Sequence, residues 1–165
     1  SEYATGIALS RYPRDKYFIA TKLSNFSPDT WGREASIAMY HNSLKELQVD
    51  YLDYMLLHGI GMGGMEAMKG RYLDNGILDF LVSERAAGRI RNLGFSYHGD
   101  IEVFDYLLSR HDEIKWDFVQ IQLNYVDWMP NICMESWSNA IFRPLLWNLY
   151  WAVGFRMFPI ILFPV

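Results

Sequence analysis

Four apolar stretches, separated by segments with helical spacing, constrain the fold of this chain more than any other feature. The stretches are rich in β-branched and aromatic residues, which favours strands. They cover 17–23 (YFIATKL), 49–58 (VDYLDYMLLH), 89–96 (RIRNLGFS) and 116–125 (WDFVQIQLNY). Apolar spacing between them predicts helices over 31–47, 72–88 and 101–114, after a first helical turn over 4–12. The chain is therefore expected to be an α/β protein.

The spacing of the predicted strands narrows the topology. Strand starts lie about 25–40 residues apart, the length of a βαβ unit. Right-handed crossovers would make the strands parallel neighbours in one sheet. Both a doubly wound sandwich and a segment of a (β/α)8 barrel fit this order, and the pattern alone does not choose between them.

Polar and glycine residues mark the ends of the predicted helices. The cluster Ser27, Asp29 and Thr30 is typical of an N-cap for the first long helix, and Asp100 for the third. Gly88 is expected to end the second as a C-cap. Residues 59–70 (GIGMGGMEAMKG) are expected to form a flexible loop over a site. Their spacing is neither G-x-G-x-x-G nor a P-loop, so they predict no nucleotide fingerprint.

Polar side chains gather where each predicted strand ends. In either architecture the carboxyl ends of parallel strands meet at one edge, where function resides. The residues there are Lys22, His58, Ser96, Tyr97, His98, Gln120, Gln122 and Asn124. Each alone has a structural interpretation, such as a solvated lysine or a hydrogen-bonded boundary histidine. Together, an amine and an imidazole at one edge favour carbonyl or proton-transfer chemistry.

Composition narrows the class of protein. The chain is 51% hydrophobic and 21% charged, with a net charge of -4. No basic block appears, so no nucleic-acid partner is expected. The single cysteine, Cys133, excludes an intramolecular disulfide and fits a reducing compartment. With no signal-peptide pattern, a cytoplasmic location is expected. The chain begins without Met, as though cut from a longer sequence.

A composition break near Trp128 divides the chain into two predicted parts. Residues 1–128 would form the α/β part, and residues 129–165 an atypical apolar tail. The charged residues of that tail are Glu135, Arg143 and Arg156. Its last 21 residues are apolar enough to resemble a membrane span, but Asn148, Arg156 and two prolines count against a spanning helix, so no membrane partner is expected. An out-of-frame or remnant tail is the favoured interpretation, with a membrane helix or an alternative core element as the others.

Several stretches resemble the aldo-keto reductase superfamily, and its bacterial members most. They are FIATKL, SLKELQVDYLDYMLLHGI, RYLDNGILDFL, AGRIRNLGFSYHGD and FVQIQLNYVDW. The likeness covers residues 1 to about 128 continuously. The resemblance implies a (β/α)8 TIM barrel, here about its third to sixth strand-helix units. It also implies reduction of small aldehydes or ketones to alcohols with NADPH or NADH.

The resemblance assigns roles to particular residues. Lys22 matches the family lysine, which lowers the pKa of a catalytic tyrosine, and His58 matches the histidine that binds the substrate carbonyl. Ser96 and Gln120 match residues that hold the nicotinamide carboxamide. Tyr97 stands where the family usually has a third such residue, an asparagine, so this cofactor contact is altered.

Two further expectations follow from the resemblance. The family's catalytic Asp and Tyr have no match in this sequence, so these 165 residues are expected to be a fragment without activity. Strands 17–23 and 116–125 would then leave their outer edges unpaired, which favours aggregation. Two alternatives stay open: a non-catalytic NADPH-binding regulatory module, and a metal-dependent hydrolase barrel with His58 and His98 as ligands.

Overall fold

The computed structural model describes residues 1–121 and 160–162, and its strands form one sheet in the order β4-β3-β2-β1-β5. The strands are β1 (Phe18–Leu23), β2 (Leu52–Ile60), β3 (Ile90–Tyr97), β4 (Phe118–Ile121) and β5 (Ile160–Leu162). Adjacent pairs among β1 to β4 are parallel. The predicted alternation and the parallel sheet are confirmed.

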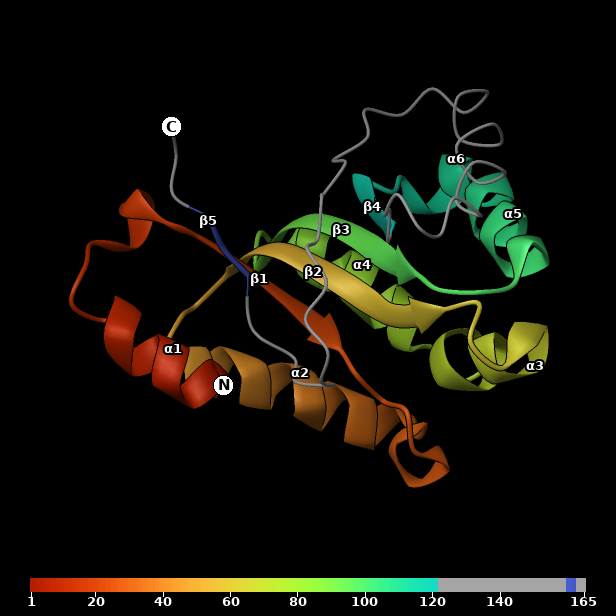
Figure 1. Cartoon of the computed structure of the whole chain (residues 1–165), viewed down its shortest axis with the longest axis horizontal. Helices are drawn as coiled ribbons and strands as arrows, with labels where there is room; N and C mark the ends of the chain where they lie inside the picture. The colour runs from red at the N-terminus through yellow and green to blue at the C-terminus, as the bar shows by residue number, and fades with distance from the viewer. Residues whose placement is uncertain (122–159, 163–165) are drawn as a thin grey trace, which may run out of the picture.

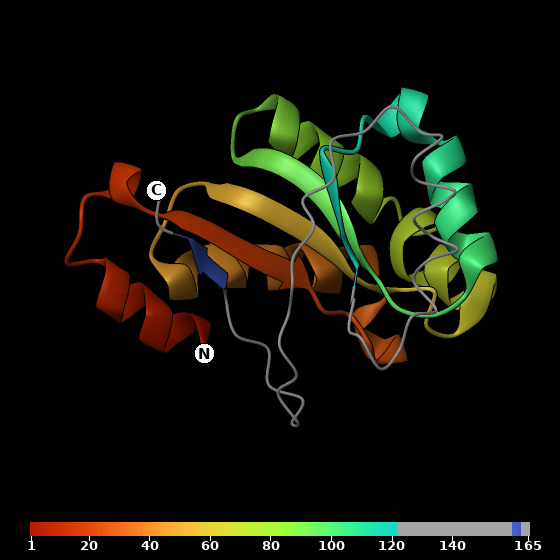
Figure 2. The same cartoon turned by 45° about the horizontal axis from the view of Figure 1, so that its top comes forward.

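Helices separate these strands along the chain. They are α1 (Glu2–Leu9), α2 (Arg33–Leu47), α3 (Gly64–Met68), α4 (Ile77–Ala86), α5 (Ile101–Ser109) and α6 (His111–Ile114). Short 3-10 turns, η1 (Arg14–Lys16) and η2 (Pro28–Thr30), flank β1, and a π-helix, η3 (Lys69–Leu73), continues α3. Figures 1 and 2 show α2 and α4 packed on one face of the twisted sheet. None of the helices described is both long and apolar enough to cross a membrane.

Three local predictions need correction. The stretch 59–70 is largely helical, because α3 begins at Gly64 and passes into η3. The second long helix begins at Ile77 and not near Tyr72, since Gly76, at φ +66°, adopts the left-handed conformation just before it. The Ser27 cluster does not cap α2, because Ser27 precedes the separate 3-10 turn η2 as its N-cap residue, and α2 follows Gly32.

Other end signals are confirmed. The Asp100 carboxylate accepts a 3.0 Å hydrogen bond from the Glu102 backbone N–H, as an N-cap residue does. Gly88 follows α4 with φ +79°, a conformation that glycine adopts without strain.

The outer edge of β1 is paired, contrary to the expectation of an open edge. β5 lies antiparallel to β1, with Phe18 opposite Leu162 and Ala20 opposite Ile160. Figure 1 shows β5 beside the first half of β1. The prediction of an unpaired strand 17–23 was therefore wrong. The residues of the predicted strand that follow Ile121 and the predicted boundary at Trp128 lie outside the described residues.

The two faces of the sheet bury different side chains, because successive residues of a strand point to opposite faces. The larger cluster packs between sheet and helices and includes Ile19, Leu57 and Phe95. The opposite face carries a small cluster made by Ala20, Leu56 and Phe118, with Tyr54 packed against it. We call this second surface the inner face.

The amino ends of the strands are tied together by a buried carboxylate. Asp53 accepts hydrogen bonds from the Ile19 backbone N–H at 2.8 Å, from Arg14 at 2.6 Å and from Arg91 at 2.8 Å. Both guanidinium groups also stack on the Tyr51 ring, at 3.9 and 4.1 Å from its centroid. This network fixes β1, β2 and β3 at the end opposite the predicted site.

Candidate functional site

Lys22 and His58 lie on the inner face at the carboxyl ends of β1 and β2. Lys22 pairs in register with Leu56, and His58 follows two residues later, so the two side chains emerge from the same face. Both are half-buried. Beneath them, Ala20 and Leu56 begin the apolar floor. The structure thus brings together the amine and the imidazole that the sequence placed at one edge.

The surroundings perturb the protonation of both groups. Burial lowers the pKa of Lys22 to about 8. Burial first of all, and then the charges of Lys22, His98 and Arg71, together lower the pKa of His58 to about 3. At neutral pH, Lys22 is therefore mostly an ammonium and His58 a neutral imidazole. A neutral imidazole beside a fixed cation suits binding of a carbonyl oxygen.

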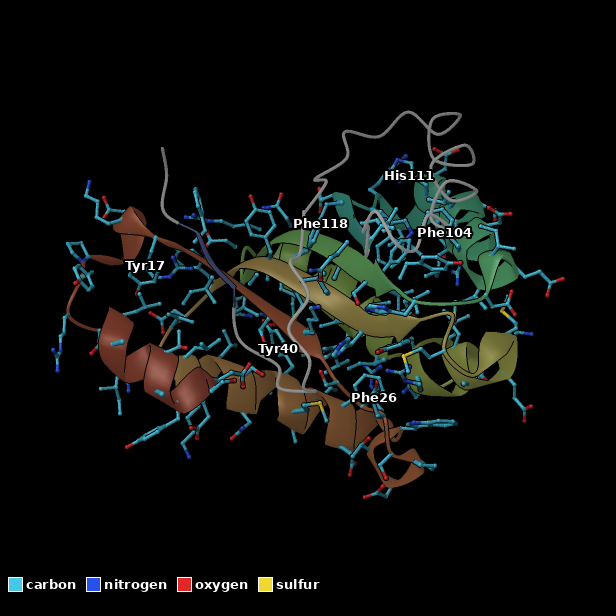
Figure 3. All side chains as sticks on the ribbon, in the orientation of Figure 1. Tyr17, Phe26, Tyr40, Phe104, His111 and Phe118 are labelled. Atoms are coloured by element: carbon cyan, nitrogen blue, oxygen red, sulfur yellow. The ribbon has the colours of Figure 1, made fainter. Side chains whose placement is uncertain are left out.

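The loop after β1 fixes the orientation of the His58 ring. The Ser24 hydroxyl lies 2.7 Å from His58 Nδ1. The Phe26 ring meets the imidazole edge-on, with centroids 4.7 Å apart. Figure 3 shows Phe26 beyond the carboxyl end of β1, far from Tyr17 at its start. Because Nδ1 contacts Ser24, Nε2 is the other ring nitrogen that can act toward a ligand.

Ser96 and Gln120 form a second polar group on the inner face. They are directly paired in register between β3 and β4, and both are buried. Within the part of the chain that the structure describes, Ser96 Oγ and Gln120 Oε1 have no hydrogen-bond partner. This hydroxyl and this amide oxygen lie side by side and are available to bond a polar ligand. A primary carboxamide, with one acceptor and two donors, fits this pair.

Tyr97 does not join Ser96 and Gln120. The next residue after Ser96 points to the opposite face, and the Tyr97 ring packs against Phe104 of α5, with centroids 4.8 Å apart. Its hydroxyl donates to the Gly99 carbonyl. The structure thus places the predicted third cofactor contact in the helix-side core. Gln122 and Asn124 lie outside the described residues.

Three residues near His58 were missed by the sequence interpretation: Ser24, Arg71 and Tyr72. Ser24 lies two residues after Lys22, on the parity that returns to the same face, a signal that could have been used. Arg71 and Tyr72 follow the glycine-rich stretch, where an arginine is ordinarily solvated. The structure buries both. Across the described ranges, no group of three or more His, Cys, Asp or Glu side chains is placed to hold a metal ion.

The depressed pKa of His58 predicts how stability depends on pH. Its folded pKa of about 3 lies below its ordinary value of 6.5, so the unfolded chain takes up the proton first as pH falls. The free energy of unfolding should therefore fall between pH 6.5 and about 3, by at most ~1.4 kcal/mol per pH unit from this group. When the free energy of unfolding is measured with urea at a series of pH values, its slope against pH should be shallower for His58→Gln than for the parent. The exposed His41 of α2 supplies the control, and equal slopes for His41→Gln and His58→Gln would contradict the prediction.

Comparison with known proteins gives a consistent family and fold. The sequence model of the Aldo/keto reductase family matches residues 1–135. A search among curated proteins finds no match. Among solved structures, the chain is similar to an aldo/keto reductase from Brucella melitensis, with 20% identity and a TM-score of 0.67 over 89% of this chain and 53% of that one.

Two more solved structures show the same fold. An aldo-keto reductase from Bacillus halodurans in its holo form has 19% identity and a TM-score of 0.64, over 88% of this chain and 45% of that one. One from Bombyx mori in complex with NADP has 23% identity and a TM-score of 0.60, over 87% and 48%. The chain spans about half the length of these proteins. The fold is a partial (β/α)8 barrel, which resolves the choice that the strand pattern left open.

Proposed function

Because this chain belongs to the aldo/keto reductase family, we propose that it supplies part of the site of an NAD(P)H-dependent oxidoreductase that reduces small aldehydes or ketones to alcohols. One observation supports this most: a neutral His58 and the Lys22 ammonium share the inner face with the orphaned pair Ser96 and Gln120. Reduction of a carbonyl by a nicotinamide cofactor needs groups that polarise the substrate carbonyl and groups that hold the cofactor carboxamide.

The residues divide these tasks. When bound, the nicotinamide cofactor would supply the hydride. The Ser96 hydroxyl would donate to the carboxamide oxygen, and Gln120 Oε1 would accept from its NH₂, which would orient the ring on the inner face. His58 Nε2–H would hold the substrate carbonyl oxygen, while Ser24 occupies Nδ1. The complex of the Bombyx mori relative with NADP supports NADP(H) as the cofactor.

Lys22 would act by its charge. Its ammonium, at the end of β1, would stabilise the anionic form of a nearby proton donor. In the family this donor is a tyrosine held by an aspartate, and no residue of this sequence matches either. We therefore propose that these 165 residues alone do not turn over, and that the site works only within a complete barrel.

A chimeric barrel tests the proposed function. Residues 1–121 would replace the structurally matched segment of the Brucella melitensis reductase, and NADPH oxidation would be followed at 340 nm with several aldehydes. Turnover is expected for the chimera and not for the 165-residue chain. A folded chimera that binds NADPH without turnover would favour the regulatory module, and one that neither binds nor turns over would refute the proposal.

Cofactor binding can also be followed on the chain itself. NADPH is expected to shift the side-chain amide signals of Gln120 in ¹H–¹⁵N spectra, assigned with Gln120→Glu. Gln48, the exposed C-cap residue of α2, is the internal control. Equal shifts for both glutamines, or none, would count against the assignment of Gln120.

A further inference from the structure

Arg71 is a buried cation that has no negative partner in the part of the chain that the structure describes. Its side chain is 3% exposed, and it takes part in no ion pair among the described residues. Every hydrogen bond that it makes there goes to a neutral oxygen. Burying a charge without a counter-charge costs several kcal/mol, which only dense hydrogen bonding offsets. Such an arrangement needs a reason beyond packing.

The oxygens that Arg71 binds belong to the two segments that carry the site. Nη2 donates to the His58 carbonyl at 2.6 Å, and Nη1 to the Gly59 carbonyl at 3.4 Å. Nε donates to the Asn25 carbonyl at 3.2 Å and to Asn25 Oδ1 at 3.3 Å. Asn25 returns a bond from Nδ2 to the Arg71 carbonyl at 2.9 Å. One guanidinium thus joins the end of β2 to the loop after β1.

Tyr72 joins the same two strand ends through a single oxygen. The register of β1 and β2 ends with Leu23 opposite Leu57. Just beyond, Tyr72 Oη accepts from the His58 N–H at 3.0 Å and from Arg71 Nη2 at 2.8 Å. Its one proton is shared between the Leu23 carbonyl at 3.0 Å and the His58 carbonyl at 2.9 Å. Burial raises the pKa of Tyr72 to about 12, so the phenol keeps that proton.

The two side chains reach the strand ends from η3. Arg71 and Tyr72 are consecutive residues within Lys69–Leu73, a π-helix with i→i+5 turns that follows α3. Gly70 allows this segment to approach the Trp31 ring, since a Cβ there would lie 2.9 Å from that ring. The segment is therefore held against the sheet end with both side chains buried.

What Arg71 holds is the loop that orients the imidazole. Asn25 is fully buried and faces Arg71, while its neighbours Ser24 and Phe26 contact the His58 ring. The Arg71 guanidinium carbon also lies 4.8 Å from the Phe26 ring centroid. Both partners of the imidazole thus depend on one anchored residue.

We propose that Arg71 and Tyr72 are positioning residues for His58, which fix the ends of β1 and β2 so that Ser24 and Phe26 hold the imidazole in one orientation beside Lys22. The relevance of this positioning to carbonyl reduction rests on the proposed function, but the positioning of the imidazole itself does not. The charged and titratable groups around the imidazole are Lys22 from β1, His98 after β3, and Arg71 from η3. Of these, Arg71 also holds the backbone.

NMR of the His58 ring in this chain tests the proposal directly. With ¹³C- and ¹⁵N-labelled histidine, and assignment by His58→Gln, the parent should show a single tautomer that resists protonation down to low pH. Arg71→Met is expected to raise the pKa of His58 by about one pH unit or more, because a cation is lost and the ring is freed. Tyr72→Phe should leave that charge in place but produce averaged tautomer signals. Arg71→Lys should bring the pKa of His58 back toward the parental value, because the charge is kept. It should restore the single tautomer less well, since lysine lacks the forked donors that hold the loop.

Matched controls separate positioning from general loosening. Tyr40 is also fully buried, but its hydroxyl donates to the Glu84 carboxylate on the helix side. Arg89 donates to the same carboxylate. Tyr40→Phe and Arg89→Met should leave the His58 signals unchanged. If Arg71→Met does not fold by circular dichroism, Tyr72→Phe decides. A folded Tyr72→Phe chain with parental His58 signals would overturn the proposal.

The chimera distinguishes the two proposals. If the chimera reduces aldehydes but Arg71→Lys and Tyr72→Phe leave kcat and its pH profile unchanged, the positioning role fails and the proposed function stands. If the chimera is inactive while the NMR effects appear, the reverse holds.

Discussion

Replacing Lys22 with methionine in the chimeric barrel is expected to lower kcat by about 10²–10⁴-fold. Methionine keeps much of the aliphatic length that packs at the end of β1, and it removes the ammonium. Without that cation, the anionic form of the proton donor loses its electrostatic support in a half-buried site, where charge effects are strong. Steady-state NADPH oxidation measures the loss.

The pH profile should report the same lysine. Burial lowers the pKa of Lys22 to about 8, so the ammonium is present below that pH and is lost above it. The parent chimera should therefore lose kcat as pH rises through 8, while Lys22→Met should show no such step. Lys45, exposed near the end of α2, provides the control, and Lys45→Met should behave as the parent. A Lys22→Met chimera with near-parental rates would show that Lys22 is only a strand end.

Replacing His58 with alanine is expected to lower kcat/KM for aldehydes by about 10²–10⁴-fold. The imidazole can donate a hydrogen bond to the carbonyl while staying uncharged, since burial and its cationic neighbours lower its pKa to about 3. Alanine removes this donor and leaves space that water can enter. Rates with saturating and limiting aldehyde would separate orientation from binding.

Two variants sharpen the His58 result. His58→Gln keeps an N–H donor at a similar reach and should recover part of the rate. His41→Ala alters an exposed histidine of α2 and should leave kcat/KM at the parental value. If His58→Ala retained parental kcat/KM, the histidine would be a structural boundary residue, held by Ser24 and by Tyr72 for the sake of the fold.

The alternation of strands and helices could be predicted from the sequence because it depends on the local spacing of apolar residues. Buried parallel strands show as continuous apolar runs, and crossover helices show the 3.6-residue spacing between them. Once the strands are parallel, their carboxyl ends must meet at one edge. The positions of Lys22, His58, Ser96 and Gln120 at that edge were predicted in this way. Ser96 and Tyr97 were wrongly grouped, although alternation along a strand already sends adjacent residues to opposite faces.

Other features follow from contacts between residues far apart in the chain, and only the tertiary structure decided them. The strand at Ile160–Leu162 pairs with β1 across about 140 residues, and no local pattern encodes such a partner. From the sequence alone, Arg71 would be predicted to be a solvated cation, because it follows a glycine-rich stretch. Its burial is possible because the carbonyls of Asn25 and His58, 46 and 13 residues away, converge on it. The sequence by itself determined the four parallel strands, the long helices between them and the edge of the sheet at which polar side chains gather. Only the folded chain decided how that edge is held, because desolvation and hydrogen bonding depend on neighbours that chain order does not supply.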